Sequence, residues 1–250
     1  MEIKGILFDK DGTLIDFFEV WGRAIRPVTE ELLNIYKIQK TEDLTTKILS
    51  EIGVHDSKID PEGSLAWKPY DMIAQDISNI IHQVKPEVQI DALELKQHLS
   101  RLFFEFQTEK QKKVPELTNL KLLMETLDDM GIKIGIATTD EYDSVKVCMK
   151  KTGVEKQISF YGAAGMELPV KPDKELLLEA AKKWNLQPDT IAVVGDTPND
   201  MRFAKNAGAI GIGVLSGTGT RADLNEIADY VIESVDELIP LVKKLHGKEI

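Results

Sequence analysis

Two carboxylates near the start of the chain have the spacing of a catalytic pair. Asp9 and Asp11 follow a short apolar run at residues 3–8 and precede Gly12 and Thr13, which are typical turn residues. The apolar run predicts a buried strand, which would hold Asp9 rigidly at its end, where its carboxylate could serve as a nucleophile. Asp11 would reach the same space from the turn. Asp and Gly are also ordinary surface-turn residues, so this short stretch alone leaves a surface turn as the alternative.

Further polar residues follow other apolar runs of the sequence. Thr138 and Thr139 follow one run, Asp196 follows another with Asp200 shortly after it, and Lys171 lies in a loop between them. If these aspartates met Asp9 and Asp11 in one place, the carboxylates would need a cation, and hard oxygen ligands favour Mg²⁺. A lysine would neutralise part of the remaining charge, and a threonine hydroxyl would donate a hydrogen bond to a phosphoryl oxygen. The residue types therefore indicate phosphoryl transfer, which depends on positioning and charge stabilisation.

Taken singly, each of these residues has an ordinary explanation. Thr138 would be a strand-end residue or a helix cap, and Lys171 would be a solvated lysine. Asp200 would be a residue that the helix dipole favours at a helix start. We predict that they share one site because each follows a predicted strand or lies between two of them, in a consistent order along the chain.

Alternating helices and strands dominate the chain from Val114 onward. A helix containing Leu117 and ending at Gly131 comes first. After the initial strand at 3–8, apolar runs predict strands at 132–137, 158–161, 191–194, 210–214 and 230–232. Short continuous apolar strands suit a parallel sheet covered on both faces. The alternation therefore predicts the α/β class with a doubly wound parallel sheet, in which ligands bind beyond the carboxyl ends of the strands.

The segment 17–111 has a different character. Its apolar residues recur at helical spacing and show no convincing buried strand. They predict four helices, at about 21–35, 41–52, 70–81 and 93–106. Because the alternating pattern resumes after this segment, we expect a discontinuous α/β core made of residues 1–16 and 112–250. Residues 17–111 would form a helical cap domain inserted after the first strand.

Composition restricts the partners and the compartment. The chain has 250 residues, a formal net charge of −11 and one cysteine, Cys148. The acidic balance argues against a nucleic-acid partner, although a local pocket can still be positive. A single cysteine excludes an intramolecular disulfide and a cysteine-clustered zinc site. With no signal-peptide pattern and no long apolar run, we expect a soluble cytoplasmic protein that has no membrane partner.

Four motifs occur in the order that is typical of one enzyme superfamily. They are Asp9-Lys10-Asp11-Gly12-Thr13-Leu14, Thr138 at a strand end, Lys171 in Lys-Pro-Asp, and Gly195-Asp196-Thr197-Pro198-Asn199-Asp200. The chain thus resembles the haloacid dehalogenase superfamily of phosphohydrolases, whose core is Rossmann-like. The motifs together span the whole predicted core.

The resemblance implies a role for each residue of the motifs. Asp9 would be the nucleophile that forms an aspartyl-phosphate intermediate. Asp11 would protonate the leaving alcohol and then activate water, so it would act first as an acid and then as a base. Thr138, Thr139 and Lys171 would bind the substrate phosphate, and Thr138 and Lys171 would also contribute to catalysis.

The same resemblance implies a cofactor and a role for the insertion. Mg²⁺ would be held by Asp9, by the backbone carbonyl of Asp11, and by Asp196, with Asp200 supporting the site. The helical insertion is similar to the C1 cap of the superfamily, which closes over the core, excludes bulk water and selects the leaving group.

The substrate class rests on weaker features. The glycine-rich run from Gly208 to Arg221 and the loop at 60–68 resemble the phosphoglycolate phosphatase branch, whereas Lys10 departs from it, since a hydrophobic or aromatic residue is commoner between the two aspartates there. We therefore expect a Mg²⁺-dependent phosphatase for a small phosphorylated metabolite, most similar to phosphoglycolate phosphatase. A sugar-phosphate mutase of the β-phosphoglucomutase type and a non-catalytic binding module on the same fold are the alternatives. The sequence does not predict an oligomeric state.

Overall fold

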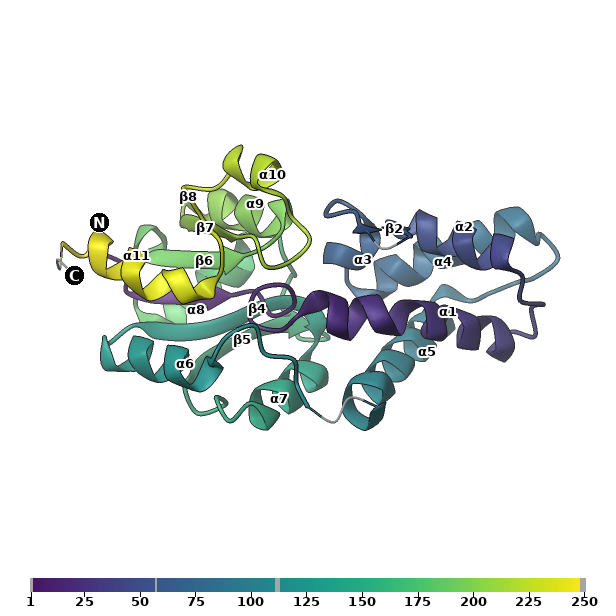
Figure 1. Ribbon diagram of the computed structural model, residues 1–250, viewed down its shortest axis with the longest axis horizontal. Helices are drawn as coiled ribbons and strands as arrows, with labels where there is room; N and C mark the ends of the chain where they lie inside the picture. Colours follow the sequence, from purple (N-terminus) through teal and green to yellow (C-terminus); the bar gives the residue numbers. More distant parts are fainter. Residues whose placement is uncertain (1, 57, 111–112, 248–250) are drawn as a thin grey trace. The chain divides into compact units, whose positions relative to one another are not determined.

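The computed structural model describes residues 2–56, 58–110 and 113–247. The chain divides into two compact units. The α/β unit comprises the residues up to Phe17 and those from Val114 onward, and the helical unit comprises Phe18–Lys113. Figure 1 labels the elements of each unit.

A six-stranded sheet forms the centre of the α/β unit (Figure 1). Its strands lie in the order β5-β4-β1-β6-β7-β8, and each neighbouring pair is parallel. This topology confirms the predicted α/β class with a doubly wound parallel sheet. The bounds are Gly5–Phe8 for β1, Lys133–Glu141 for β4, Ile158–Ala164 for β5, Ile191–Gly195 for β6, Ile210–Val214 for β7 and Tyr230–Ile232 for β8.

Helices connect these strands and cover the sheet. Strands β1, β6 and β7 are buried along their whole length, as expected of central parallel strands with both faces covered. The α-helices are α6 (Leu120–Asp129), α7 (Tyr142–Lys151), α8 (Glu175–Trp184), α9 (Pro198–Ala207), α10 (Arg221–Asn225) and α11 (Leu238–Leu245). Two short 3₁₀ helices, η3 (Pro188–Thr190) and η4 (Val235–Glu237), precede β6 and α11.

One apolar cluster joins the strands to α8 and α9. Leu7 of β1 and Phe203 of α9 are fully buried in it. Phe160 of β5 meets Trp184 of α8 edge to face, with ring centroids 6.0 Å apart. Because this packing fixes the strands against each other, it also fixes the positions of the residues that follow them.

The register of the sheet brings three strand ends to one edge. Phe8, the last residue of β1, pairs with Ile136 of β4 on one side and with Val194 of β6 on the other. Asp9 and Asp196 therefore emerge from neighbouring strands at the carboxyl edge, where open α/β sheets bind their ligands.

Strand β4 is longer than expected. We predicted that it would stop before Thr138, but it continues to Glu141. Its pairing with β5 shifts register between Ala137 and Glu141, which is the mark of a bulge or a similar irregularity. The polar residues at 138–140 thus lie within an irregular extension of the strand.

The first helix after the insertion is shorter than expected. Leu117 lies outside α6, which begins at Leu120. The side chain of Asn119 caps the helix by accepting a hydrogen bond from the Leu122 backbone N–H at 3.1 Å. An Asn that satisfies an otherwise unpaired N–H at a helix start is a strong N-cap, and it defines the start more sharply than the apolar spacing does.

The helical unit contains its own compact core. Its elements are η1 (Phe18–Gly22), α1 (Arg23–Ile35), α2 (Glu42–Glu51), β2 (Val54–His55), β3 (Lys58–Ile59), α3 (Ser64–Trp67), α4 (Tyr70–Val84), α5 (Ala92–Glu105) and η2 (Phe106–Lys110). The rings of Trp21, Tyr70 and Phe103 pack together, with Trp21 and Phe103 centroids 4.6 Å apart.

The expectation that this segment contains helices alone is wrong in one detail. Strands β2 and β3 form a small antiparallel pair. Two-residue strands are too short to produce an alternating pattern, so they could not be predicted from the sequence. Among the described residues, no helix combines the length and the apolar character needed to span a bilayer.

The burial of β1 leads to a prediction about stability. Leu7→Ala should lower the free energy of unfolding by about 2–5 kcal/mol, because Leu7 is 0% exposed and the substitution leaves a cavity in the core. Leu122→Ala is a matched control, since that residue is 62% exposed, and it should change stability by no more than about 0.5 kcal/mol. Urea unfolding followed by circular dichroism measures both, and equal losses would contradict the placement of β1 in the core.

Candidate active site

Asp9 follows β1, one of the two central strands of the sheet. Its backbone N–H donates to the carbonyl of Val194 at 2.8 Å, which continues the pairing with β6 by one residue. The side chain is 11% exposed. The strand therefore holds this carboxylate in a fixed place at the carboxyl edge, as a nucleophile requires.

The turn after Asp9 folds back against Asp196. Gly12 has φ +85°, a left-handed conformation that favours glycine. A Cβ at Gly12 would stand 2.5 Å from Asp196 Oδ2, so only glycine permits this approach. The next residue, Thr13, is fully buried and its hydroxyl donates to Asp196 Oδ1 at 3.4 Å.

A second glycine-rich loop encloses Asp196 from the other side. The backbone N–H of Thr218 donates to Asp196 Oδ2 at 2.8 Å. A Cβ at Gly217 would lie 2.0 Å from that same oxygen, and one at Gly219 would lie 2.1 Å from the Asp196 carbonyl oxygen. Part of the glycine run between Gly208 and Arg221 is thus explained by close contact with this one aspartate.

Asp200 is positioned by the start of helix α9. Thr197 is the N-cap, and the two residues form a capping box in which each side chain pairs with the other residue's backbone N–H. Asp200 Oδ2 accepts from the Thr197 hydroxyl at 2.6 Å and from its N–H at 3.0 Å. The other carboxylate oxygen of Asp200 is therefore directed away from the cap.

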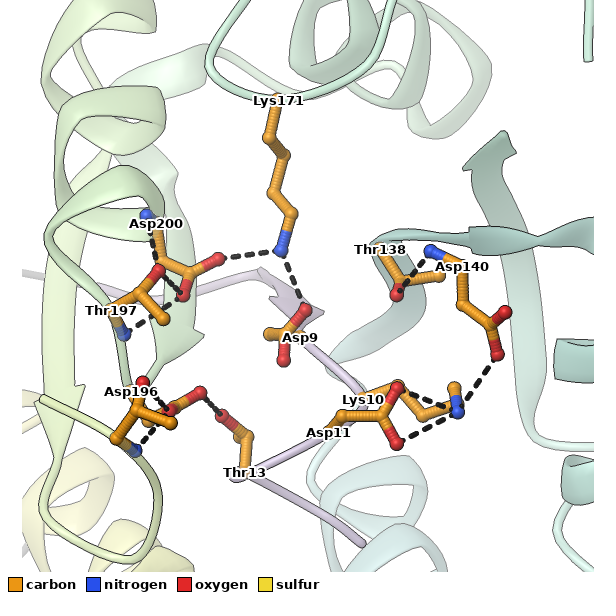
Figure 2. Close-up of polar contacts among 11 residues, drawn as sticks. Asp9, Lys10, Asp11, Thr13, Thr138, Asp140, Lys171, Asp196, Thr197 and Asp200 are labelled. Carbon is orange, nitrogen blue, oxygen red and sulfur yellow. Dashed lines mark hydrogen bonds and ion pairs between the residues drawn. The ribbon is translucent and has the colours of Figure 1, made fainter. Parts of the chain in front are cut away.

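Lys171 joins Asp9 to Asp200. Its ammonium Nζ lies 2.6 Å from Asp9 Oδ1 and 2.5 Å from Asp200 Oδ1, and Figure 2 shows it between the two. The lysine is 4% exposed, and a buried ammonium is tolerated only when it is paired in this way. A residue from the loop before α8 thus completes a cluster whose other members follow β1 and β6.

The cluster carries more negative charge than Lys171 balances. Burial raises the pKa of Asp9 from its ordinary 3.8 to about 7, against the opposing effect of Lys171 and with a further rise from the Asp200 carboxylate. Burial and the neighbouring Asp9 and Asp200 carboxylates raise the pKa of Asp196 well above its usual range. Burial disfavours charge on Lys171 as well, but Asp200 and Asp9 outweigh it and raise its pKa. The site therefore favours an additional cation.

The donor set fits a metal ion. Asp9, Asp196 and Asp200 each offer a carboxylate oxygen, and these oxygens all lie within 4.8 Å of one another. All three residues are buried, which leaves the carboxylates few other ways to compensate their charge. This triad can bind a metal ion, and hard oxygen donors suit a hard divalent cation. The side chain of Asp11 is outside the triad, so any part of Asp11 in metal binding stays a prediction that concerns its backbone carbonyl.

The two predicted phosphate-binding threonines lie on the β4 side of Asp9. Figure 2 shows Thr138 there, with Asp200 on the opposite side of Asp9. Thr138 is buried, and its hydroxyl oxygen accepts from the Asp140 backbone N–H at 3.2 Å. Thr139 is half-buried. The structure thus gathers Thr138 with Asp9, Lys171 and Asp200 at one edge of the sheet.

Several polar residues of the site were not predicted from the sequence. Asp140 and Lys10 form a buried ion pair with an Nζ–Oδ2 distance of 3.0 Å. Asn199, at the start of α9 next to Asp200, is buried, and its Nδ2 has no hydrogen-bond partner among the described residues. Asn199 and Lys10 lie inside recognised motifs, but the sequence does not show that their side chains are buried or which residues they contact. Asp140 was marked only by its place two residues after Thr138.

The model of a hydrolase family, described as haloacid dehalogenase-like hydrolase, matches residues 3–208. The chain belongs to this family. The match confirms the resemblance inferred from the four motifs and, with it, an enzyme of the hydrolase class.

Curated relatives and solved structures agree with this assignment. The chain is 28% identical to the pyrophosphatase PpaX of Bacillus mycoides over 99% of this chain and 100% of the relative. It is 24% identical to the phosphoglycolate phosphatase of Escherichia coli K12 over 99% and 95%. The crystal structure of a predicted phosphoglycolate phosphatase from Haemophilus somnus has a TM-score of 0.72 at 19% identity, covering 96% of this chain and 98% of that one. The expected class, a phosphoric monoester hydrolase, agrees with the family and with the phosphatase names.

The excess of buried carboxylate predicts how stability responds to a cation. Because the pKa of Asp9 is raised to about 7, the native state binds more protons than the unfolded state between about pH 4 and about pH 7. Without a cation, this contribution to stability falls as the pH rises through that window. A divalent cation binds the deprotonated carboxylates, so its stabilising effect should grow with pH.

Thermal unfolding with and without millimolar Mg²⁺ measures this effect. At about pH 8 we expect a stabilisation of about 2–3 kcal/mol at a large excess of ion over Kd, and a clearly smaller one at about pH 5. Asp196→Asn should reduce the gain, whereas the exposed Asp189→Asn should not. An equal gain at both pH values, or an undiminished gain in Asp196→Asn, would contradict the triad as the binding site.

Proposed function

We propose that this chain is a Mg²⁺-dependent phosphatase that hydrolyses a small phosphorylated metabolite through an aspartyl-phosphate on Asp9. The observation that carries the proposal is the placement of Lys171 between Asp9 and Asp200, at 2.6 Å and 2.5 Å, beside Asp196. One buried cation and three buried carboxylates form a site that is suited to receive both a metal ion and a phosphate dianion. Asp9, Asp196 and Asp200 would hold Mg²⁺, which would screen the phosphate charge from the attacking carboxylate.

The first half of the reaction transfers the phosphoryl group to the enzyme. A carboxylate oxygen of Asp9 attacks phosphorus while the bond from phosphorus to the leaving oxygen breaks. Asp11 gives its proton to that oxygen, so that the product departs as a neutral alcohol. Lys171 and the Thr138 hydroxyl would bind the phosphoryl oxygens, where charge is stabilised in the transition state.

The second half returns the enzyme to its starting form. Asp11, now a carboxylate, takes a proton from a water molecule as that water attacks the phosphorus bound to Asp9. The phosphorus–oxygen bond to Asp9 breaks, and inorganic phosphate leaves. Asp9 is again a carboxylate, and Asp11 is again protonated for the next cycle.

The names of the relatives support a substrate class for the proposal. The related phosphatases bear the names phosphoglycolate phosphatase and pyrophosphatase, and both names denote small, strongly anionic phosphate compounds. We propose a compound of this kind, with 2-phosphoglycolate as the first candidate, and we assign the helical unit the role of a cap that selects the leaving group. A sugar-phosphate mutase would instead keep water away from the aspartyl-phosphate.

Hydrolysis of p-nitrophenyl phosphate tests the nucleophile and the cofactor together. Asp9→Asn should lower kcat/KM by on the order of 10³-fold or more, because no covalent intermediate can form. Wild-type activity should depend on Mg²⁺ and be abolished by a chelator. The exposed Asp189→Asn makes the same chemical change away from the site and should keep wild-type activity.

Three results would contradict the proposal. Full turnover by Asp9→Asn would exclude Asp9 as the nucleophile. The absence of turnover on any phosphate ester would favour a binding module. Conversion of a sugar phosphate to its isomer without release of inorganic phosphate would identify a mutase.

A further inference from the structure

Lys10 is buried beside the cluster formed by Asp9, Asp196, Asp200 and Lys171. The proposed reaction assigns it no role. Figure 2 shows its ammonium group on the β4 side of the site, near Asp11 and Asp140. Its side chain is 1% exposed. Burial of an ammonium is strongly unfavourable unless ion pairs and hydrogen bonds compensate it, so the role of Lys10 is inferred from its contacts.

The contacts of Lys10 fix both oxygens of Asp11. Its Nζ lies 2.9 Å from Asp11 Oδ1 and 2.7 Å from Asp11 Oδ2. A carboxylate that is held through both oxygens by one buried group loses most of its freedom to rotate. Lys10 thus fixes the side chain to which the proposed function assigns two proton transfers.

Asp140 in turn fixes Lys10. Asp140 Oδ2 lies 3.0 Å from Lys10 Nζ and accepts from the Ser144 hydroxyl at 2.7 Å. Asp140 Oδ1 accepts from the Glu141 backbone N–H at 2.8 Å. The chain of contacts therefore runs from the start of α7, through the irregular end of β4, to Lys10 and then to Asp11.

The residues in this series of contacts differ in how exposed their side chains are. The side chains of Lys10 and Asp140 are each 1% exposed, whereas that of Asp11 is 10% exposed. The first two form a rigid buried support, and Asp11 is the group that a substrate and water can reach. Stability alone does not demand such a support, because apolar residues of similar volume can often replace a buried ion pair without loss.

We propose that Lys10 and Asp140 are positioning residues that hold the Asp11 carboxyl group in place for proton transfer. The inference rests on the proposed function, in which Asp11 protonates the leaving oxygen and later deprotonates water. Neither residue touches the reacting atoms. Each acts through Asp11.

Substrates with different leaving groups can distinguish a positioning role of Lys10 and Asp140 from a purely structural one. Phenolate is a poor leaving group that needs the proton from Asp11, whereas dinitrophenolate departs without one. The ratio kcat/KM reports only the steps up to the first irreversible one, here transfer of the phosphoryl group to Asp9. A misplaced Asp11 should therefore lower kcat/KM for phenyl phosphate and spare it for dinitrophenyl phosphate.

The experiment measures both esters with wild type, Lys10→Met and Asp140→Asn in the presence of Mg²⁺. For Lys10→Met we expect kcat/KM on phenyl phosphate to fall about 10²-fold, the lower range for general acid catalysis, and to change less than about threefold on dinitrophenyl phosphate. On dinitrophenyl phosphate, kcat and KM should both fall by the same factor. The reason is that hydrolysis of the aspartyl-phosphate, in which water attacks phosphorus, also needs Asp11. Asp140→Asn should show the same selectivity, with a smaller loss.

A control and the opposing results complete the test. Lys146→Met removes a 2.7 Å ion pair with Glu155 elsewhere in the α/β unit and should leave the ratio between the two esters unchanged. Equal losses on both esters in Lys10→Met and Asp140→Asn, or no loss in either variant, would overturn the inference and leave the proposed function intact. Failure of wild type on both esters, or full turnover by Asp9→Asn, would instead overturn the proposed function. Because Asp140→Asn keeps the volume of the side chain, it remains informative if Lys10→Met does not fold.

Discussion

The site depends on one electrostatic constraint, which is that several carboxylates are buried at the same edge of a sheet. Lys171 compensates part of this charge by pairing with Asp9 and Asp200 at once. Burial, together with the neighbouring carboxylates, still raises the pKa values of Asp9 and Asp196, so the compensation is incomplete. A divalent cation would restore the balance, and the bound cation together with Lys171 would then let the site accept an anionic phosphate, which suits phosphoryl transfer.

Each of the two aspartates in the motif that begins at Asp9 is paired with a different buried lysine. Lys171 is shared between Asp9 and Asp200, and Lys10 is shared between Asp11 and Asp140 (Figure 2). Two aspartates that are neighbours in the sequence therefore belong to different ionic clusters. The division corresponds to the two tasks of the proposed reaction, in which one carboxylate would attack phosphorus and the other would exchange protons. A strand end followed by a glycine turn makes this separation possible.

Much of the fold and of the site was predictable because it depends on local patterns. Apolar runs ending in Asp9 and Asp196 identified β1 and β6, and the parallel topology then brought the two residues to one edge. What the sequence could not show was pairing between side chains. Lys10 stood out only as an unusual residue, because neither its burial nor its contact with Asp140 is encoded locally. Thr138 was placed after a strand that in fact continues through it, since a register shift depends on the partner strand β5.

The central claim is that the phosphoryl group passes through Asp9, and trapping the intermediate tests it most directly. The enzyme would be mixed with a phosphate ester and Mg²⁺, quenched in acid within milliseconds, reduced with borohydride and digested for mass spectrometry. Borohydride reduces an acyl phosphate but not a free carboxylate, so the account predicts homoserine in place of aspartate at position 9, with Asp11, Asp196 and Asp200 unchanged. Reduction at a different aspartate, or inorganic phosphate released by an enzyme that never carries a reducible acyl phosphate, would contradict it.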